Sequence, residues 1–498
     1  MCCVGASRRS IIQRLRRLSS PRTDPITQGL IMITAPALQA RAARLPRLLV
    51  AVGIAALLAG CSSLAYQKPQ MAVAAAFSAS SNARVSVDNS NKAWWTAFRD
   101  QRLSRLIDRG LSQNLSIAQA VERINEANAG MIAVGATVLP SASGSVAGRE
   151  SGGSGASSSS VTYGATASWM LDLFGQYANS RKAAEAGLDQ AYLSADTARL
   201  TFLSELTNAY IDLRYYQESL ALTRSSLATR QQTLELTQSL LNNGAGSQLD
   251  VLQAQSALDA ASLQLPSQEL GFVRSLNRLA TLTAQSTGAI EKDLIKGAPQ
   301  PWPRAKVNAG VPADLIRQRP DIQAAERALL AATANAGIAE AQLYPSITLS
   351  GNIQLAALAG GNTTSWGFGP TLSLPFLDGG RAKANHQAAL SKVNQAYLSW
   401  QSAVRGAIEE TENALAAVRR DGRSIDAATK VSDSAQRQLE LARKSYQEGQ
   451  GQILDVLNAE RNLFDAKAQL ATSTRQYASN YVALNVAIGG GIGALPAK

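Results

Sequence analysis

The residues of this chain that could do chemistry are few, and their spacing does not assemble a catalytic site. His386 is the only histidine among 498 residues, so the usual general base is scarce. Cys2, Cys3 and Cys61 form no Cys/His pair or metal-ligand cluster, and the G-x-S-x-G nucleophile elbow is missing. We therefore expect no enzyme activity, no cofactor and no metal site, and we interpret His386 as a solvated side chain on a helix.

Cys61 is the one residue whose setting indicates covalent chemistry. Arginines and then the short apolar run 48–58 precede Ala59-Gly60-Cys61. A basic segment, a short apolar run and small residues describe a secretory signal, and the run is too short to span a membrane. The segment resembles the lipobox of bacterial lipoproteins, which implies cleavage before Cys61 and acylation of that cysteine; an N-terminal anchor helix is the alternative. Residues 1–60 are thus the expected signal region, with Met32 as an alternative start of translation.

The formal net charge of +12 is concentrated in this same region. Residues 1–60 contain nine arginines, no lysine and one acidic residue, so the remainder of the chain is close to balance. We therefore expect no nucleic-acid partner. Removal of the signal would leave Cys61 as the only cysteine, so no intrachain disulfide can form.

Two carboxylates, Asp250 and Asp455, occupy the same place in a repeated stretch. The sequence GAGSQLDVL at 244–252 is echoed by GQGQILDVL at 449–457, 205 positions later. The leading glycines, Gly244 and Gly449, suit the left-handed conformation that ends a helix, and the polar residues after them suit the start of another. Each copy is therefore predicted to be the tip of a helical hairpin.

Long helices must position these tips. Leucine recurs every seven residues from Leu206 to Leu241, and a second heptad stripe runs from Tyr397 to Tyr446, which indicates coiled-coil packing. We place the two helical hairpins at 176–285 and 380–488. The other predicted segments are an acylated tether at 61–91, short helices at 92–140, a Pro- and Gly-rich connector at 286–319, a helix at 320–344 and a tail at 489–498.

Strands are predicted between the short helices and the long ones in both halves. Apolar and polar residues alternate within 141–173 and within 345–377, so each segment is expected to form a hairpin with one apolar face. Runs of about ten residues have the length of tilted transmembrane strands; a soluble sandwich is the alternative. Four membrane strands leave open edges, which a bilayer does not tolerate, so several copies must share one barrel. A trimer gives twelve strands with a lumen, continued by a helical tunnel.

The chain resembles the outer membrane efflux protein family, the TolC/OprM/NodT-like outer membrane factors of tripartite pumps, over nearly all of residues 61–498. The residues that carry the resemblance are Cys61, Trp94-Trp95 with Phe98, Leu171 to Gly175, Arg319 to Ile322 with Ala325-Glu326, Pro375 to Gly380, both tip motifs and Gly489 to Gly491. The resemblance implies a mixed α and β membrane protein: a homotrimer with a 12-stranded β-barrel and a periplasmic α-barrel tunnel twelve helices wide. It also implies a periplasmic adaptor and an inner-membrane transporter of the RND type as partners.

In that family the hairpin tips close the periplasmic end, which implies that Asp250 and Asp455 form acidic rings and that Tyr446 ties neighbouring helices. Gly451 stands where the family's TolC member has an arginine, and Asn458 where it has an aspartate, so the salt-bridged lock and second acidic ring of that member are in doubt here. The alternative for the two aspartates is that they cap the second arm of each hairpin.

We therefore expect a lipid-anchored outer membrane exit duct that passively exports drugs or other small toxic compounds. A duct of a type I protein secretion system, and a structural or adhesive outer membrane lipoprotein, are the alternatives. Arg319-Pro320-Asp321 is interpreted as a helix start, because proline is tolerated in the first turn and an acid there complements the helix dipole.

Overall fold

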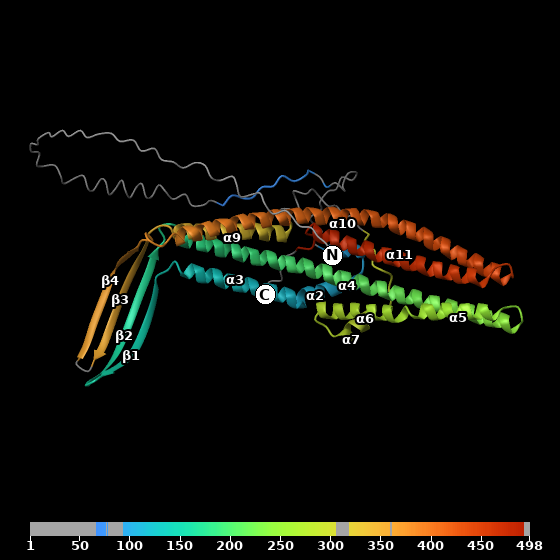
Figure 1. The fold of residues 1–498 in the computed structure, drawn as a ribbon, viewed down its shortest axis with the longest axis horizontal. Helices are drawn as coiled ribbons and strands as arrows, with labels where there is room; N and C mark the ends of the chain where they lie inside the picture. Colours follow the sequence, from blue (N-terminus) through green and yellow to red (C-terminus); the bar gives the residue numbers. More distant parts are fainter. Residues whose placement is uncertain (1–65, 76, 78–92, 305–317, 359–360, 493–498) are drawn as a thin grey trace, which may run out of the picture. The chain divides into compact units, whose positions relative to one another are not determined.

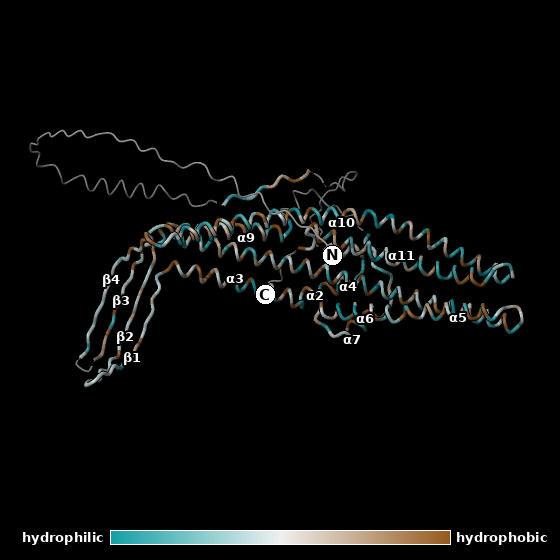
Figure 2. The backbone as a smooth tube through the Cα atoms, in the orientation of Figure 1, coloured by the Kyte–Doolittle hydropathy of each residue, from teal (hydrophilic) through white to brown (hydrophobic). Residues whose placement is uncertain are grey.

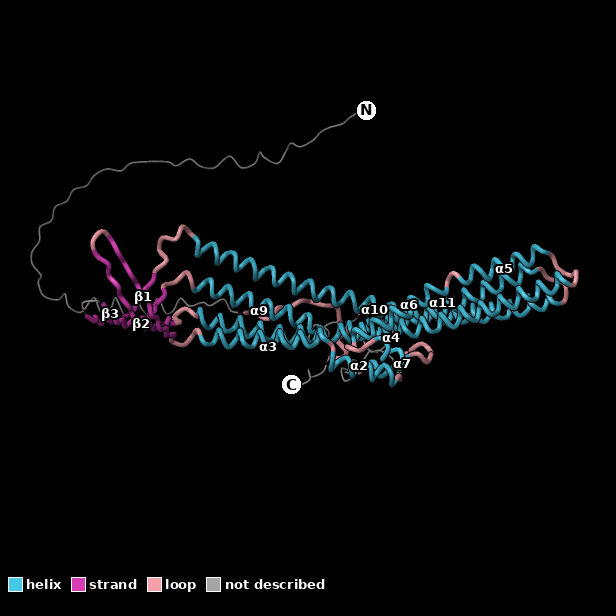
Figure 3. Tube along the Cα trace, turned by 90° about the horizontal axis from the view of Figure 1, so that it is seen from below, coloured by secondary structure: helices cyan, strands magenta, loops and turns pink. Residues whose placement is uncertain are grey.

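The computed structural model describes residues 66–75, 77, 93–304, 318–358 and 361–492. The signal region, Cys61 and most of the expected tether lie outside these residues. Along the chain the elements are η2 (Trp94–Phe98), α2 (Gln101–Gln113), α3 (Leu115–Ala136), β1 (Ser141–Gly153), β2 (Ala156–Leu171), α4 (Gln176–Asn242), α5 (Gln248–Ser262), α6 (Leu265–Leu282), α7 (Thr287–Leu294), α9 (Pro320–Ala341), β3 (Ser346–Leu358), β4 (Gly361–Ser373), α10 (Arg381–Gln447) and α11 (Ile453–Ala487). Within residues 93–492, the sheet adjoins one end of the long helices and both hairpin tips lie at the other end (Figures 1 and 3).

The internal repeat is visible in the lengths and starts of the long helices. Helices α4 and α10 have 67 residues each. Gly175 and Gly380 precede them at equivalent positions, and both have positive φ angles, 76° and 85°. Glycine is suited to this left-handed conformation, which turns the chain from strand into helix. The two halves of the sequence therefore build the same strand–turn–helix unit.

The four strands form one antiparallel sheet in the order β1-β2-β3-β4. The central pair joins the two repeats, with Tyr163 opposite Leu355 and Trp169 opposite Leu349. Directly opposed residues point to the same side of a sheet, so the alternation expected from the sequence gives one apolar and one polar face. The apolar face includes Val146, Tyr163, Ile353, Leu355, Trp366 and Phe368.

The long helices pack side by side along their heptad stripes. On α4, Leu206 and Leu213 are fully buried and Leu220 and Leu234 nearly so. Hydrophilic and hydrophobic residues are interspersed along α4 and α10 (Figure 2). Among the described helices, none is both long enough and apolar enough to cross a membrane.

The largest apolar core lies midway along the helices, where η2, α2, α4, α6, α7 and α11 meet. Trp94, Ile107, Leu206 and Tyr481 are buried there, and the Phe98 ring packs edge-on against Tyr481. The Trp94-Trp95-Phe98 motif therefore anchors the start of the first repeat against the end of the second.

The second arm of the first hairpin is not a single helix. It is divided between α5 and α6 at Leu263 and Gln264, just before Pro266, whereas α11 continues unbroken for 35 residues. Proline cannot donate the backbone hydrogen bond that a continuous helix requires at Pro266, and it is tolerated in the first turn of α6, where that bond is not made.

The expected irregular connector also contains a helix, α7, in its described part. Arg214 and Gln217 of α4 donate hydrogen bonds to the carbonyl oxygens of Lys296 and Leu294 at its C-terminal end. Those long-range contacts hold α7 against α4, and they could not be read from the local sequence.

Candidate functional site

Both hairpin tips begin with the same helix-ending motif. Gly244 and Gly449 each have a φ of 72°. The Gly244 N–H donates to the Leu241 carbonyl at 3.0 Å, and the Gly449 N–H donates to the Tyr446 carbonyl at 3.0 Å. The next residue in each copy donates to a carbonyl five residues earlier, at 2.9 Å, which completes a Schellman motif. The two glycines are thus placed where a side chain would strain the backbone.

The tip carboxylates start the second arm of each hairpin. Asp250 accepts a hydrogen bond from the Ser247 N–H, while the Asp250 N–H donates to the Ser247 hydroxyl, both at 3.1 Å. In the other hairpin the Gln452 N–H donates to the Asp455 carboxylate at 3.4 Å, and the Asp455 N–H donates to the Gln452 backbone carbonyl at 3.1 Å. The capping alternative therefore describes how each carboxylate sits in one chain. Acidic rings formed by several copies remain a prediction.

Tyr446 is influenced by the charge of the first hairpin's carboxylate although the two residues belong to different repeats. Burial raises the pKa of the Tyr446 phenol, and the negative charge of Asp250 raises this pKa further. Tyr446 also packs against an apolar cluster that includes Leu439, Ile453 and Val456. Among the site residues predicted from the sequence, Asp250 and Tyr446 are the pair brought together.

The two departures from the TolC pattern have local explanations. A Cβ at Gly451 would lie 3.0 Å from the Ser445 hydroxyl and 3.2 Å from the Tyr446 backbone nitrogen, so the turn is tightly closed at this glycine. The Asn458 side chain accepts a hydrogen bond from Arg461 at 3.1 Å on the same helix.

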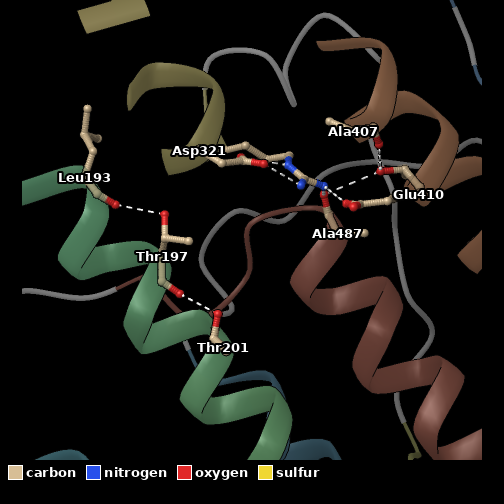
Figure 4. A network of polar contacts seen from close by, with 9 residues as sticks. Leu193, Thr197, Thr201, Asp321, Ala407, Glu410 and Ala487 are labelled. Carbon is tan, nitrogen blue, oxygen red and sulfur yellow. Dashed lines mark hydrogen bonds and ion pairs between the residues drawn. The ribbon is translucent and has the colours of Figure 1, made fainter. Parts of the chain in front are cut away.

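A second site, which the sequence indicated only as a helix start, surrounds Arg319. Its partners Asp321, Glu410 and Ala487 are labelled in Figure 4. Its guanidinium donates to both carboxylate oxygens of Asp321, at 3.0 and 2.7 Å. It also reaches Glu410 of α10 at 2.8 Å and the carbonyl of Ala487 of α11 at 2.9 Å. Burial alone lowers the pKa of Arg319, but the hydrogen bonds and charges of Asp321 and Glu410 outweigh it and raise the pKa. Arg319 therefore joins the start of α9, the middle of α10 and the end of α11.

The three glycines at 489–491 lie beside this junction. The Gly490 carbonyl accepts a hydrogen bond from the Trp94 indole at 3.2 Å, and the Gly491 carbonyl accepts one from Arg199 at 3.1 Å. A Cβ at Gly491 would lie 2.8 Å from the Leu203 side chain, so the chain passes here too closely for a larger residue. Trp94 and the triple glycine, distant in sequence, thus act as one structural unit.

The part of the expected tether that the structure describes is packed against the second repeat. The Tyr66 hydroxyl donates to Glu326 of α9 at 3.3 Å, and the Lys68 ammonium lies 3.6 Å from the same carboxylate. Phe77 is buried against Ala414, Leu415 and Leu484. Cys61 precedes these residues and lies outside the described part, so its acylation stays a prediction.

The described residues offer no group of His, Cys, Asp and Glu arranged to hold a metal ion. His386 lies on α10 and is half-buried. The arrangement at the tips holds backbone and charge in place, and its chemistry is that of helix capping and hydrogen bonding.

Comparison with known proteins identifies close relatives of this architecture. The family described as Outer membrane efflux protein matches residues 106–285 and again residues 311–490, one match for each repeat. Nodulation protein T of Rhizobium leguminosarum bv. trifolii is 42% identical over 450 residues, covering 87% of this chain and 95% of its own length. The cation efflux system protein CusC of Escherichia coli O6:H1 is 30% identical over 453 residues, covering 88% of this chain and 97% of its own.

The solved structure of the outer-membrane channel OprN has a TM-score of 0.77 to this chain, with 27% sequence identity, and covers 86% of this chain and 98% of OprN. The expected fold class, with long paired helices, four strands and a two-fold internal repeat, is confirmed by this similarity.

Proposed function

Because this chain belongs to the outer membrane efflux protein family, we propose that it is the exit duct of a tripartite efflux system. It is an outer membrane protein of a family whose members are channels rather than enzymes. The duct would passively export drugs or other small toxic compounds, with the energy supplied by an inner-membrane transporter.

The observation that carries this proposal is the exposed sheet with two unpaired edges. Strands β1 and β4 each have one neighbour, so each presents unpaired backbone groups on its outer side. Trp366 and Phe368 on the apolar face are 78% and 81% exposed. In water, such edges and such a face would both favour aggregation. Pairing β4 of one copy with β1 of the next satisfies the edges, and lipid covers the apolar face.

Three copies give the twelve strands expected for a water-filled lumen. The polar face, which includes Thr162, Asn352 and Gln354, would then line the lumen. On the helical side, Leu249, Leu252 and Leu263 are exposed in one chain and are available for contacts with the neighbouring copies. We therefore propose a homotrimer in which the helices continue the lumen away from the membrane.

The hairpin tips support the proposed partners. They lie at the end of the helices opposite the sheet (Figure 1), so in a trimer they would surround the inner end of the duct. A periplasmic adaptor and an inner-membrane transporter, of the RND type, would meet the duct at this end. Acylated Cys61 would hold each copy to outer membrane lipid.

The cargo proposed here is a broad class. One relative is named for nodulation and another for cation efflux. An exit duct surrounds its cargo with a lumen shared by several copies, so selection belongs to the transporter that loads it.

The test is assembly and conductance of the purified full-length protein. We expect native mass spectrometry to give a trimer, and planar lipid bilayers to show discrete ion currents. A protein that remains monomeric and gives no current would overturn the proposed function. The outcome that favours the type I secretion alternative is different. In that case, cells that also contain the inner-membrane transporter export a protein but no small molecule.

A further inference from the structure

The four strands carry only two charged side chains, and these are neighbours in the sequence. Arg149 and Glu150 lie on β1, whereas β2, β3 and β4 contain no Asp, Glu, Lys or Arg. Successive side chains of a strand point to opposite faces of the sheet, so the two charges are separated by the sheet itself. One face therefore has a single positive charge, and the other face has a single negative charge.

The register shows which face each charge occupies. In β2, the residues of odd number, such as Tyr163, belong to the apolar face, and those of even number belong to the polar face. Arg149 is directly opposite Ser160, so it lies on the polar face. Glu150 is directly opposite Ser159, so it lies on the apolar face. Arg149 is thus the only charged residue on the polar face of the described sheet.

Arg149 lies near the end of the sheet that is away from the helices. Along the register it is level with Leu358 and Gly361, where β3 ends and β4 begins. The exposed rings of Tyr163 and Trp366 are nearer to the helical end of the strands. Aromatic rings on the outside of a membrane barrel mark the level of the lipid interface. Arg149 therefore lies beyond these rings, at the outer mouth of the proposed duct.

Nothing on the polar face neutralises this charge. The other side chains of that face are uncharged, and most of them carry hydroxyl groups. Rings of arginine in pores favour anions, and a guanidinium can bind a phosphate group through two parallel hydrogen bonds. The tips at the other end of the helices carry the carboxylates Asp250 and Asp455. The two ends of the duct would therefore have opposite charge preferences.

We propose that Arg149 determines the charge preference of the outer mouth, where each copy contributes one guanidinium to the lumen. The inference rests on the proposed function as a duct that several copies form. Anionic compounds pass this mouth more readily than cations of the same size. A polyanion in the external solution binds to the arginines of several copies at once and obstructs the current.

The experiment measures block of single channels by tripolyphosphate, with the full-length protein in planar lipid bilayers. The polyanion is added first to one chamber and then to the other, and the two half-blocking concentrations are compared. We expect block of the unmodified protein at about tenfold lower concentration from one side, because a mouth of one charge sign concentrates counter-ions by at least that factor. Arg149→Gln should abolish most of this difference, whereas Arg149→Lys should retain it.

Glu150→Gln is the matched control, because it removes the neighbouring charge from the opposite face of the sheet. Charges farther apart than the Debye length, about 10 Å at an ionic strength of about 0.1 M, are largely screened. At this ionic strength the control should keep the sided block of the unmodified protein. Equal effects of Glu150→Gln and Arg149→Gln would overturn the proposal, since the face of the sheet would then be irrelevant.

A second pair of variants keeps the test decisive if Arg149→Gln does not assemble. Ser160→Glu retains Arg149 and places a carboxylate directly opposite it on the polar face, so we expect the sided block to be lost. Ser159→Glu adds the same charge to the other face and should leave the block unchanged.

The remaining outcomes separate this inference from the proposed function. Sided block that persists in both Arg149→Gln and Ser160→Glu would overturn the inference, and so would unmodified channels that conduct but are blocked from neither side. Absence of any current from the unmodified protein would instead count against the proposed function as a duct.

Discussion

Asp250 and Asp455 occupy equivalent positions in the repeat, yet their surroundings differ. Each carboxylate accepts a backbone hydrogen bond at the start of its helix. Only Asp250 acts on the phenol of Tyr446, while Asp455 is exposed. The sequence predicted the caps, because the polar residues follow a helix-ending glycine. The effect of the Asp250 charge on the Tyr446 phenol links residues almost 200 positions apart, and local spacing carries no information about it.

This difference predicts a selective change in the titration of Tyr446. Asp250→Asn removes the charge that raises the Tyr446 pKa, so we expect the pKa to fall while staying above its ordinary value, because burial still raises it. A raised pKa means that the tyrosine's contribution to stability is present below the ordinary value near 10 and is lost as the pH rises through the raised value. NMR of labelled tyrosine, with Tyr446→Phe to assign the signal, measures the shift. Asp455→Asn is the control and should leave it unchanged; an equal shift in both variants would contradict the assignment.

The tip glycines give a second prediction at this scale. Gly449→Ala places a Cβ on a residue with a φ of 72°, which should destabilise the tip by about 1–2 kcal/mol. Gly422→Ala, in the interior of α10 with no atom within 4 Å of the added Cβ, should instead stabilise by about 0.4–1 kcal/mol. Hydrogen exchange of the amides at 444–456 reports the difference. A tip that exchanges equally slowly in both variants would show that Gly449 is not required for its conformation.

At the scale of elements, hydrophobic periodicity predicted the long helices and the strands well. The heptad leucines of α4 are buried, and the alternating residues of β2, β3 and β4 form one apolar and one polar face. The break between α5 and α6 was not specified in advance, although Pro266 lies beside it. The helix α7 and the Arg319 junction were missed for a different reason: both depend on contacts with distant elements, and a sequence pattern records only what neighbours along the chain require.

The contact between α4 and α6 can be tested through one glycine. A Cβ at Gly271 would lie 2.2 Å from the Tyr216 ring, so Gly271→Ala forces the helices apart and should cost about 1–3 kcal/mol. Gly187→Ala on α4 is the control, since the added Cβ meets no atom within 4 Å there. Thermal unfolding of the assembled protein measures both. Adding Tyr216→Ala to Gly271→Ala should recover part of the loss, whereas no recovery would place the clash elsewhere.

At the scale of the whole molecule, the chain is incomplete in two respects. The sheet has two unpaired edges, and its most exposed side chains are aromatic. Neither feature is satisfied by the residues that the structure describes, since the helices adjoin the end of the sheet rather than its faces (Figure 3). Copies of the chain must supply the edges and lipid must cover the face. The sequence predicted this requirement from the number of strands, because four strands cannot close a sheet.

The proposed lipid anchor sets the last prediction. Cys61 precedes Tyr66 by five residues, and a fully extended chain spans at most about 3.3–3.6 Å per residue, so the acylated residue lies within roughly 17–18 Å of Tyr66. Tyr66 contacts Glu326 near the start of α9, and α9 leads directly to β3. We expect radiolabelled palmitate to be incorporated into the unmodified protein and not into Cys61→Ser.

The control replaces Cys2 and Cys3 together with serine; both lie in the predicted signal region, so labelling should persist. Labelling of Cys61→Ser would refute the anchor, while a trimer assembled by that unlabelled variant would show that edge pairing, and not the lipid, holds the copies together.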